Sequence, residues 1–146
     1  MKRVFTNMAA LLLCMCFLFS TASAFDGVQT ERIDYEDGSY AIITTVTGGL
    51  TRASKADSKT YTYYNSSDQR CFSYTLYATF TYNGVTSTAD SSVGGAELYL
   101  RGWDLISQNE WTSGSAAYGT ASFSGPNGES RPVSLSLVCD RNGTVK

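Results

Sequence analysis

The fold is decided by residues 71–84, which read CFSYTLYATFTYNG. The even positions of this stretch are all apolar or aromatic, whereas the odd positions are mostly serine and threonine, with Tyr77 among them. A period of two residues is typical of a β-strand that has one face on a core and the other toward water. The pair Asn83-Gly84 predicts a two-residue type I′ turn after this strand, because both residues tolerate the positive φ that the turn needs.

A two-residue turn would also set the register of the next strand, with Tyr82 opposite Val85. One residue departs from the alternation, because Cys71 falls on the polar parity although cysteines are among the most buried residues. We therefore expect a bulge near residues 71–73 that returns Cys71 to the core side.

Residues 1–24 predict a cleaved export signal, and hence a secreted, extracellular protein. Two basic residues precede an apolar run over 8–19, and an Ala-Ser-Ala triplet ends at Ala24. The apolar run is too short for a transmembrane helix. A lipid anchor on Cys14 or Cys16 is the alternative, but neither cysteine follows the small residue that such a signal needs.

The expected mature chain, residues 25–146, has a length that suits one domain. Without Lys2 and Arg3 it contains nine basic and thirteen acidic residues and no basic cluster. Nucleic acid is therefore not an expected partner. An anionic membrane surface would not attract the chain either, and we expect no membrane insertion after the signal is removed.

Two cysteines remain in the mature chain, Cys71 and Cys139. Their even number and the oxidising destination predict one disulfide between them. Two free buried thiols are the alternative.

Residues 25–49 predict an N-terminal hairpin that turns at Asp37-Gly38. The nearby acidic residues could suggest calcium, but they lack the spacing of a calcium-binding loop, so we expect a solvated turn and no metal. Residues 50–58 are small, polar and without period, which indicates a flexible linker. The main domain would then span residues 59–146.

Further strand signals follow at residues 96–101, 104–111, 117–123 and 132–139, and no segment of the mature chain has a helical period. We therefore expect an all-β, single-domain, immunoglobulin-like sandwich of about eight short antiparallel strands with one disulfide and Greek-key-like wiring. A small β-barrel is the alternative.

The chain contains no histidine, which removes the usual general base and the commonest metal ligand. Ser-His-Asp and Cys-His nucleophilic sites are thereby excluded, and two cysteines make a zinc site a poor interpretation. No phosphate-binding Gly-Lys-Ser/Thr motif occurs. We expect no cofactor and no catalytic residue.

Paired carboxylates are the remaining route to catalysis. Glu97, Asp104 and Glu110 lie near the tryptophans of the chain. Two carboxylates at a separation set by the fold suffice for glycoside hydrolysis. A small carboxylate-dependent hydrolase of extracellular polysaccharide is therefore our alternative function.

Aromatic residues are the stronger signal, because exposed rings stack on sugars and on protein surfaces. Parity places the aromatic residues at even positions of residues 71–84 in the core. The candidates for a binding surface are Tyr61, Tyr63, Tyr77, Trp103 and Trp111. These residues favour a non-enzymatic module that binds a glycan or a surface protein.

The chain contains, in this order, SKTYTYYNSS, a strand that ends FTYNG, a short segment with tryptophan, and SLSLVCDRNG. Together these stretches resemble a family of small exported proteins of unknown function from clostridial Gram-positive bacteria. The resemblance covers residues 31–146 and implies export and an uncharacterised domain. It carries over no catalytic or binding residue.

Overall fold

The structure is a computed structural model that describes residues 25–48 and 54–146. These residues form eight β-strands and no helix that could span a membrane. The strands are β1 (Phe25–Asp34), β2 (Tyr40–Gly48), β3 (Ser54–Tyr64), β4 (Arg70–Tyr82), β5 (Ser87–Leu98), β6 (Asp104–Ser113), β7 (Ala116–Ser124) and β8 (Ser130–Val138). The expected export signal, residues 1–24, lies outside the described residues.

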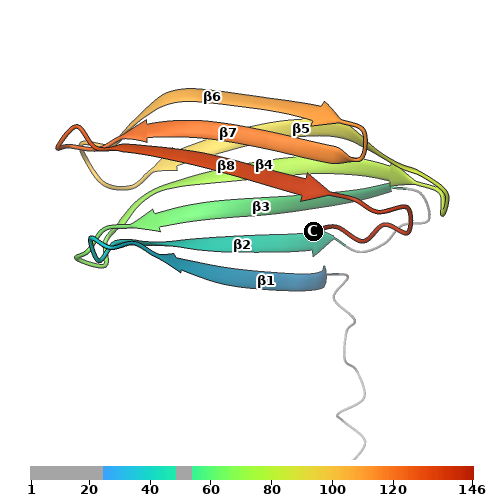
Figure 1. Cartoon of the computed structure of the whole chain (residues 1–146), viewed down its shortest axis with the longest axis horizontal. Coiled ribbons are helices and arrows are strands. Elements are labelled where there is room, and N and C mark those ends of the chain that lie inside the picture. Colours follow the sequence, from blue (N-terminus) through green and yellow to red (C-terminus); the bar gives the residue numbers. More distant parts are fainter. Residues whose placement is uncertain (1–24, 49–53) are drawn as a thin grey trace, which may run out of the picture.

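The strands form two antiparallel sheets that lie in two layers (Figure 1). Sheet A contains β1 to β5 and sheet B contains β6 to β8, each in sequence order. The all-β prediction with two sheets and eight strands is confirmed, and the alternative of one closed barrel is not what the structure shows. The wiring is a meander and not the Greek-key-like arrangement that we expected, because each strand pairs with the next one along the chain within its sheet.

The alternation in residues 71–82 is confirmed by β4, which provides the centre of the core. Phe72, Tyr74 and Leu76 are fully buried, whereas Tyr77 and Thr79 are exposed. Phe72 stacks on Phe123 of sheet B, with 3.9 Å between the ring centroids. The core therefore lies between the middle of sheet A and sheet B.

The predicted bulge at Cys71 is confirmed in the pairing of β3 with β4. Tyr63 lies opposite Phe72, whereas Tyr64 lies opposite Arg70. Cys71 is the extra residue between these two pairs, and it is fully buried.

The predicted two-residue turn after β4 is wrong, because Tyr82 lies opposite Ser87 and not opposite Val85. The loop has four residues, and Asn83 does not adopt the positive φ of a type I′ turn. Its side-chain oxygen instead accepts hydrogen bonds from the backbone N–H groups of Val85 and Thr86, at 2.9 and 2.8 Å. The register moves by two residues, so each side chain next to the turn keeps its predicted face.

The predicted Cys71–Cys139 disulfide is also wrong, because both cysteines are buried free thiols. Cys71 lies at the beginning of β4. The backbone of Cys139 lies near the other end of β4, since its carbonyl accepts a hydrogen bond from Ser87, and Ser87 pairs with Tyr82. The length of β4 separates the thiols by roughly 30 Å, far beyond the reach of a disulfide.

The predicted linker at residues 50–58 needs a correction as well. Residues 54–58 belong to β3, while residues 49–53 lie outside the described part of the chain. Lys55 and Asp57 occupy inward positions of this strand, opposite Phe80 and Ala78. Because these inward positions hold charged residues, the sequence shows no apolar alternation here, and the strand was predicted as a linker.

Candidate binding surfaces

The structure buries three of the five aromatic residues that we predicted at a binding surface. Tyr61, Tyr63 and Trp103 belong to the core, whereas Tyr77 is 54% exposed and Trp111 is 43% exposed. The two buried tyrosines follow from the register, because Tyr61 lies opposite Tyr74 and Tyr63 lies opposite Phe72. Side chains opposite one another in a sheet share a face, so these tyrosines face the core with β4.

Trp103 is buried because it covers one end of the sandwich. Its ring packs against Phe72 and Tyr63, at centroid distances of 4.9 and 5.3 Å. The preceding Gly102 has a φ of +92°, which turns the chain toward the core at this point. The connection between β5 and β6 thus supplies a core residue, Trp103.

Tyr77 lies halfway along β4 on the outer face of sheet A, in a row of apolar side chains that we call the valine–tyrosine row. The row consists of Val28, Val46, Tyr77 and Val93, with Ser58 between Val46 and Tyr77. Val28 and Val93 are more than half exposed. A shallow hollow of about 390 Å³ lies along this row.

A row of threonines lies beside the valine–tyrosine row on the same face. Its members are Thr30, Thr44, Thr60 and Thr75, one from each of β1 to β4. The hydroxyls of Thr60 and Thr75 are hydrogen-bonded at 2.9 Å. The middle of this face therefore offers methyl groups, one phenol ring and hydroxyls, without a charged side chain.

Trp111 lies on the opposite side of the molecule, on the outer face of sheet B. Its ring stacks on that of Tyr118, with 5.2 Å between the centroids and 14° between the planes. The two residues are cross-strand partners of β6 and β7. The pair forms a second aromatic surface that shares no residue with the valine–tyrosine row.

The three candidate carboxylates belong to three different faces. Glu110 turns inward and accepts a 2.7 Å hydrogen bond from the hydroxyl of Tyr74. Burial and this carboxylate raise the pKa of Tyr74. Glu97 lies on the outer face of sheet A, where the hydroxyl of Tyr99 donates to it, and Asp104 is exposed at the beginning of β6, opposite Ser124. These carboxylates do not face one another across a cleft.

The acidic turn of the first hairpin is organised by protein groups. Asp37 accepts hydrogen bonds from the side chain and backbone of Ser39, and Arg131 donates to its second oxygen. These donors, those of Ser39 first, lower the pKa of Asp37 to about 2. In residues 25–48 and 54–146 no three cysteine or acidic side chains gather in a way that could hold a metal ion.

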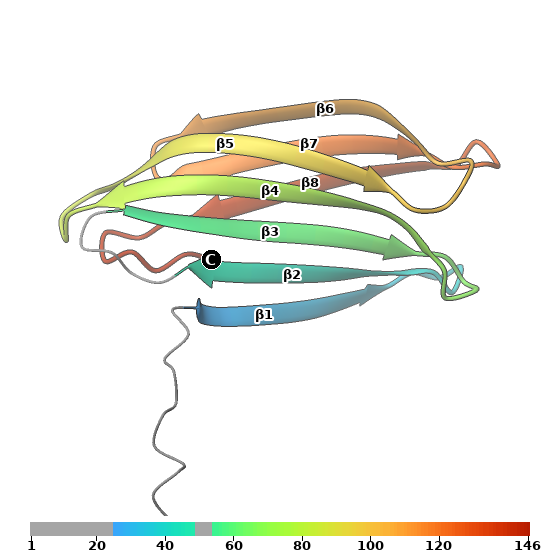
Figure 2. The same cartoon turned by 180° about the vertical axis from the view of Figure 1, so that it is seen from behind.

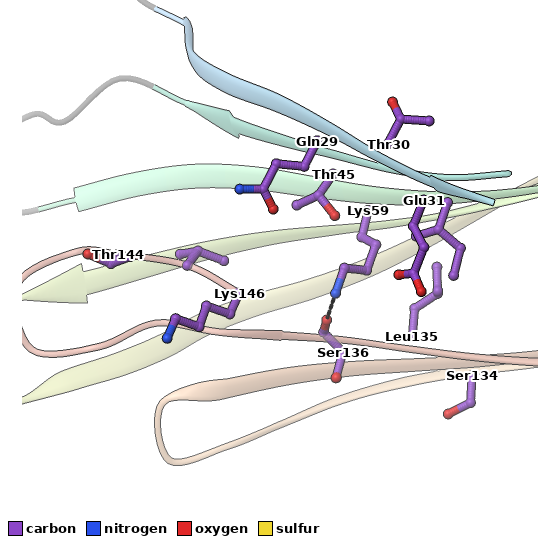
Figure 3. A pocket seen from close by; sticks show the side chains of 12 residues that line it. Gln29, Thr30, Glu31, Thr45, Lys59, Ser134, Leu135, Ser136, Thr144 and Lys146 are labelled. Atoms are coloured by element: carbon purple, nitrogen blue, oxygen red, sulfur yellow. Dashed lines mark hydrogen bonds between the residues drawn. The ribbon is translucent and has the colours of Figure 1, made fainter. Parts of the chain in front are cut away.

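A groove lies between the two sheets, at the edge formed by β8, and we call it the edge groove (Figure 3). Its volume is about 610 Å³. One wall is the inner face of β1, β2 and β3, and the other is β8 with residues 144–146; the lining residues are Gln29, Thr30, Glu31, Ile43, Thr45, Lys59, Ser134, Leu135, Ser136, Thr144, Val145 and Lys146. The ammonium of Lys59 crosses the groove and donates to the carbonyl of Ser136 at 3.0 Å (Figure 3).

Sequence reasoning did not identify the edge groove. The alternation in β8 indicates which of its side chains point outward. It does not indicate whether another strand covers its edge, because that depends on strand order and on the relative width of the sheets. No signal in the sequence alone would have located this site.

The fold and these surfaces define a small antiparallel two-sheet protein whose candidate binding features, within the described residues, are two outer faces and the edge groove. No family model matches this chain, and no similar protein was found among curated proteins or solved structures.

Proposed function

We propose that this protein is an exported, non-enzymatic binding module that contacts a protein partner at the cell surface through the outer face of sheet A. The observation that carries the proposal is the valine–tyrosine row, which places apolar side chains on four of the five strands; those of Val28, Tyr77 and Val93 are exposed and that of Val46 is half-buried. Exposed apolar residues that gather on one face are typical of an interaction site.

The dimensions of this face suit a protein partner. Five strands about 4.8 Å apart and about 30 Å long offer roughly 700 Å². A specific protein interface covers about 800 Å² on each partner. Tyr77 lies halfway along β4, between the central strand β3 and the edge strand β5, and tyrosine is among the residues that most often dominate binding energy.

A glycan partner is the second candidate, and the stacked Trp111–Tyr118 pair favours it. Stacked rings on a sheet that also presents serine and threonine hydroxyls could hold the apolar face of a sugar. The carboxylates needed for the alternative hydrolase, Glu97, Asp104 and Glu110, lie on separate faces, which supports binding without cleavage.

The proposal includes secretion of the protein and its resemblance to exported clostridial proteins. The signal pattern in residues 1–24 and the resemblance to exported clostridial proteins support secretion. The intact mass of the secreted protein should correspond to a chain that begins at Phe25. We extend the immunoglobulin-like comparison to the two-layer architecture only, because the wiring of the strands is a meander.

The test is binding of purified residues 25–146 to surface proteins and cell-wall glycans of the producing cell. We expect Tyr77→Ala to weaken protein binding at least tenfold, as for an aromatic residue that dominates the binding energy of an interface. Val85→Ala is the matched control, since Val85 is exposed in the loop outside the row. Loss of glycan binding in Trp111→Ala would support the second candidate. Unchanged binding in both aromatic variants, or cleavage of polysaccharide by the unaltered protein, would contradict the proposal.

A further inference from the structure

We propose that the edge groove receives an extended polypeptide segment of another molecule, which pairs with β8 as a fourth strand of sheet B. This interaction goes beyond the proposed function, because it uses neither the valine–tyrosine row nor the Trp111–Tyr118 pair.

The first observation is the unequal width of the sheets. Sheet B packs against β3, β4 and β5, while β1 and β2 extend beyond it (Figures 1 and 2). At the opposite side the sandwich is closed, since β6 contacts β5 and Gln108 donates to the carbonyl of Gly94 at 3.1 Å. The uncovered inner face includes Ile43, which is half-buried. A further strand beside β8 would cover it.

The second observation is the direction of the backbone groups of β8. Val138 exchanges two hydrogen bonds with Lys146, at 3.0 and 3.1 Å, so its N–H and C=O point away from β7. In an antiparallel ladder every second residue points the same way, which gives Ser136 and Ser134 this direction too. Among the described residues, the carbonyl of Ser136 accepts from the Lys59 ammonium alone, and the backbone groups of Ser134 have no hydrogen-bond partner on this edge.

The third observation is that the chain itself already uses this mode of pairing. Val145 forms an antiparallel bridge with Cys139, and Lys146 pairs with Val138. Residues 144–146 thus occupy the first part of the row beside β8, and the edge groove continues this row toward Ser134. The backbone of an extended polypeptide repeats its donors and acceptors with the period that this edge presents, which glycans and small molecules do not.

The side chains of the groove indicate the sequence of the segment. Ile43 and Leu135 offer apolar contact to a side chain that points inward. The ammonium groups of Lys59 and Lys146 outnumber the one carboxylate of the lining, that of Glu31, so the charge of the groove favours a carboxylate (Figure 3). We therefore infer a segment of alternating β-branched residues with an acidic residue on the inward face.

The probe for this inference is a blocked synthetic heptapeptide of sequence TVTETVT, in which the two valines and the glutamate share the inward face, added to 15N-labelled residues 25–146. We expect saturable binding and hydrogen exchange at least tenfold slower at the Ser134 and Ser136 amides. A peptide methylated on alternate backbone nitrogens, and one with glutamine in place of glutamate, should bind at least tenfold and several-fold more weakly, respectively. Absence of saturable binding would overturn the inference.

The variant that isolates strand pairing is Ser134→Pro. Proline removes an N–H that makes no bond to β7, and Pro132 already occupies an equivalent position of β8 two residues earlier. We expect at least tenfold weaker peptide binding, whereas Ser134→Ala keeps the N–H and should bind as the unaltered protein does. If Ser134→Pro fails to fold, the comparison of the methylated and unmethylated peptides decides the question in the unaltered protein.

The outcomes separate this inference from the proposed function. Tyr77→Ala should bind the heptapeptide normally, so a failure of the outer-face proposal leaves this result unaffected. Equal binding of the methylated peptide, protection at the β1 amides instead of the β8 amides, or pairing of two copies of the chain through β8 would each overturn the inference.

Discussion

Lys55 and Asp57 form a buried ion pair at the beginning of β3. Their side chains are 4% and 0% exposed, and 3.8 Å separates Lys55 Nζ from Asp57 Oδ1. The backbone N–H of Gly48 donates to the same oxygen at 2.8 Å, and Oδ2 has no hydrogen-bond partner. Burial raises the pKa of Asp57, while the Gly48 hydrogen bond and Lys55 oppose this rise. Removal of Lys55 should therefore destabilise the folded protein in a pH-dependent manner.

The perturbation is Lys55→Met, which keeps the length of the side chain and removes its charge. At an effective dielectric constant of about 20, a pair at this distance loses about 4 kcal/mol of attraction. The variant can avoid a buried unpaired charge by protonating Asp57. For a carboxyl with an unfolded pKa near 3.9, this protonation costs about 4 kcal/mol at pH 7, which sets an upper limit on the loss from the ion pair. The carbonyl of Gly143, which accepts from Lys55 at 3.1 Å, adds about 1 kcal/mol at any pH. We expect a total loss of about 4–5 kcal/mol at pH 7.

The sign of the pH dependence follows from the raised pKa of Asp57 in the variant. Such a carboxyl opposes folding when it is ionised, so the part of the loss that comes from the ion pair is largest at high pH and disappears as the pH falls below the unfolded pKa of about 3.9. At pH 5 the cost of protonating Asp57, which limits the loss from the ion pair, is only about 1.5 kcal/mol. The destabilisation of Lys55→Met relative to the unaltered protein should therefore fall by at least about 2 kcal/mol between pH 7 and pH 5.

The assay is urea unfolding at both pH values, followed by the fluorescence of the buried Trp103. Lys59→Met is the matched control, because Lys59 donates to a carbonyl and forms no ion pair in the described structure, so its loss should not depend on pH. The double variant Lys55→Met/Asp57→Asn should lose the pH dependence. An equal loss for Lys55→Met at pH 7 and pH 5 would refute the reasoning and assign the effect to packing.

Three further predictions concern other parts of the structure. Cys71 and Cys139 should resist alkylation in the folded protein, because burial raises the pKa of both thiols, and both should react without reductant after unfolding; a linked peptide in a non-reducing map would contradict this. Gly119→Ala should cost about 1–3 kcal/mol, because the new methyl would lie 2.4 Å from the hydroxyl oxygen of Tyr74, and an unchanged urea midpoint would show that the sheets can separate without penalty. Gly84→Val should cost at least about 1 kcal/mol, since Gly84 has a φ of +82° and nothing lies within 4 Å of the new Cβ atom to compensate; Gly84→Asn should cost less.

The sequence by itself determined the features that depend on neighbours along the chain. The alternation in residues 71–82 placed Phe72, Tyr74 and Leu76 in the core, and the parity of Cys71 predicted its bulge. The Asp37-Gly38 turn follows the same logic, with Gly38 at a φ of +79°. These predictions succeed because the two faces of a strand and the conformation of a tight turn are decided within a few residues.

Only the tertiary structure decided which surfaces are covered. Tyr61 and Tyr63 are buried because the β3–β4 register aligns them with the core face of β4, and Cys71 and Cys139 stay apart because they lie at opposite ends of the sandwich. The edge groove exists because sheet B is narrower than sheet A. Periodicity assigns a side chain to one face of a strand, but the order, the register and the number of strands in each sheet determine whether that face meets a core, a groove or water.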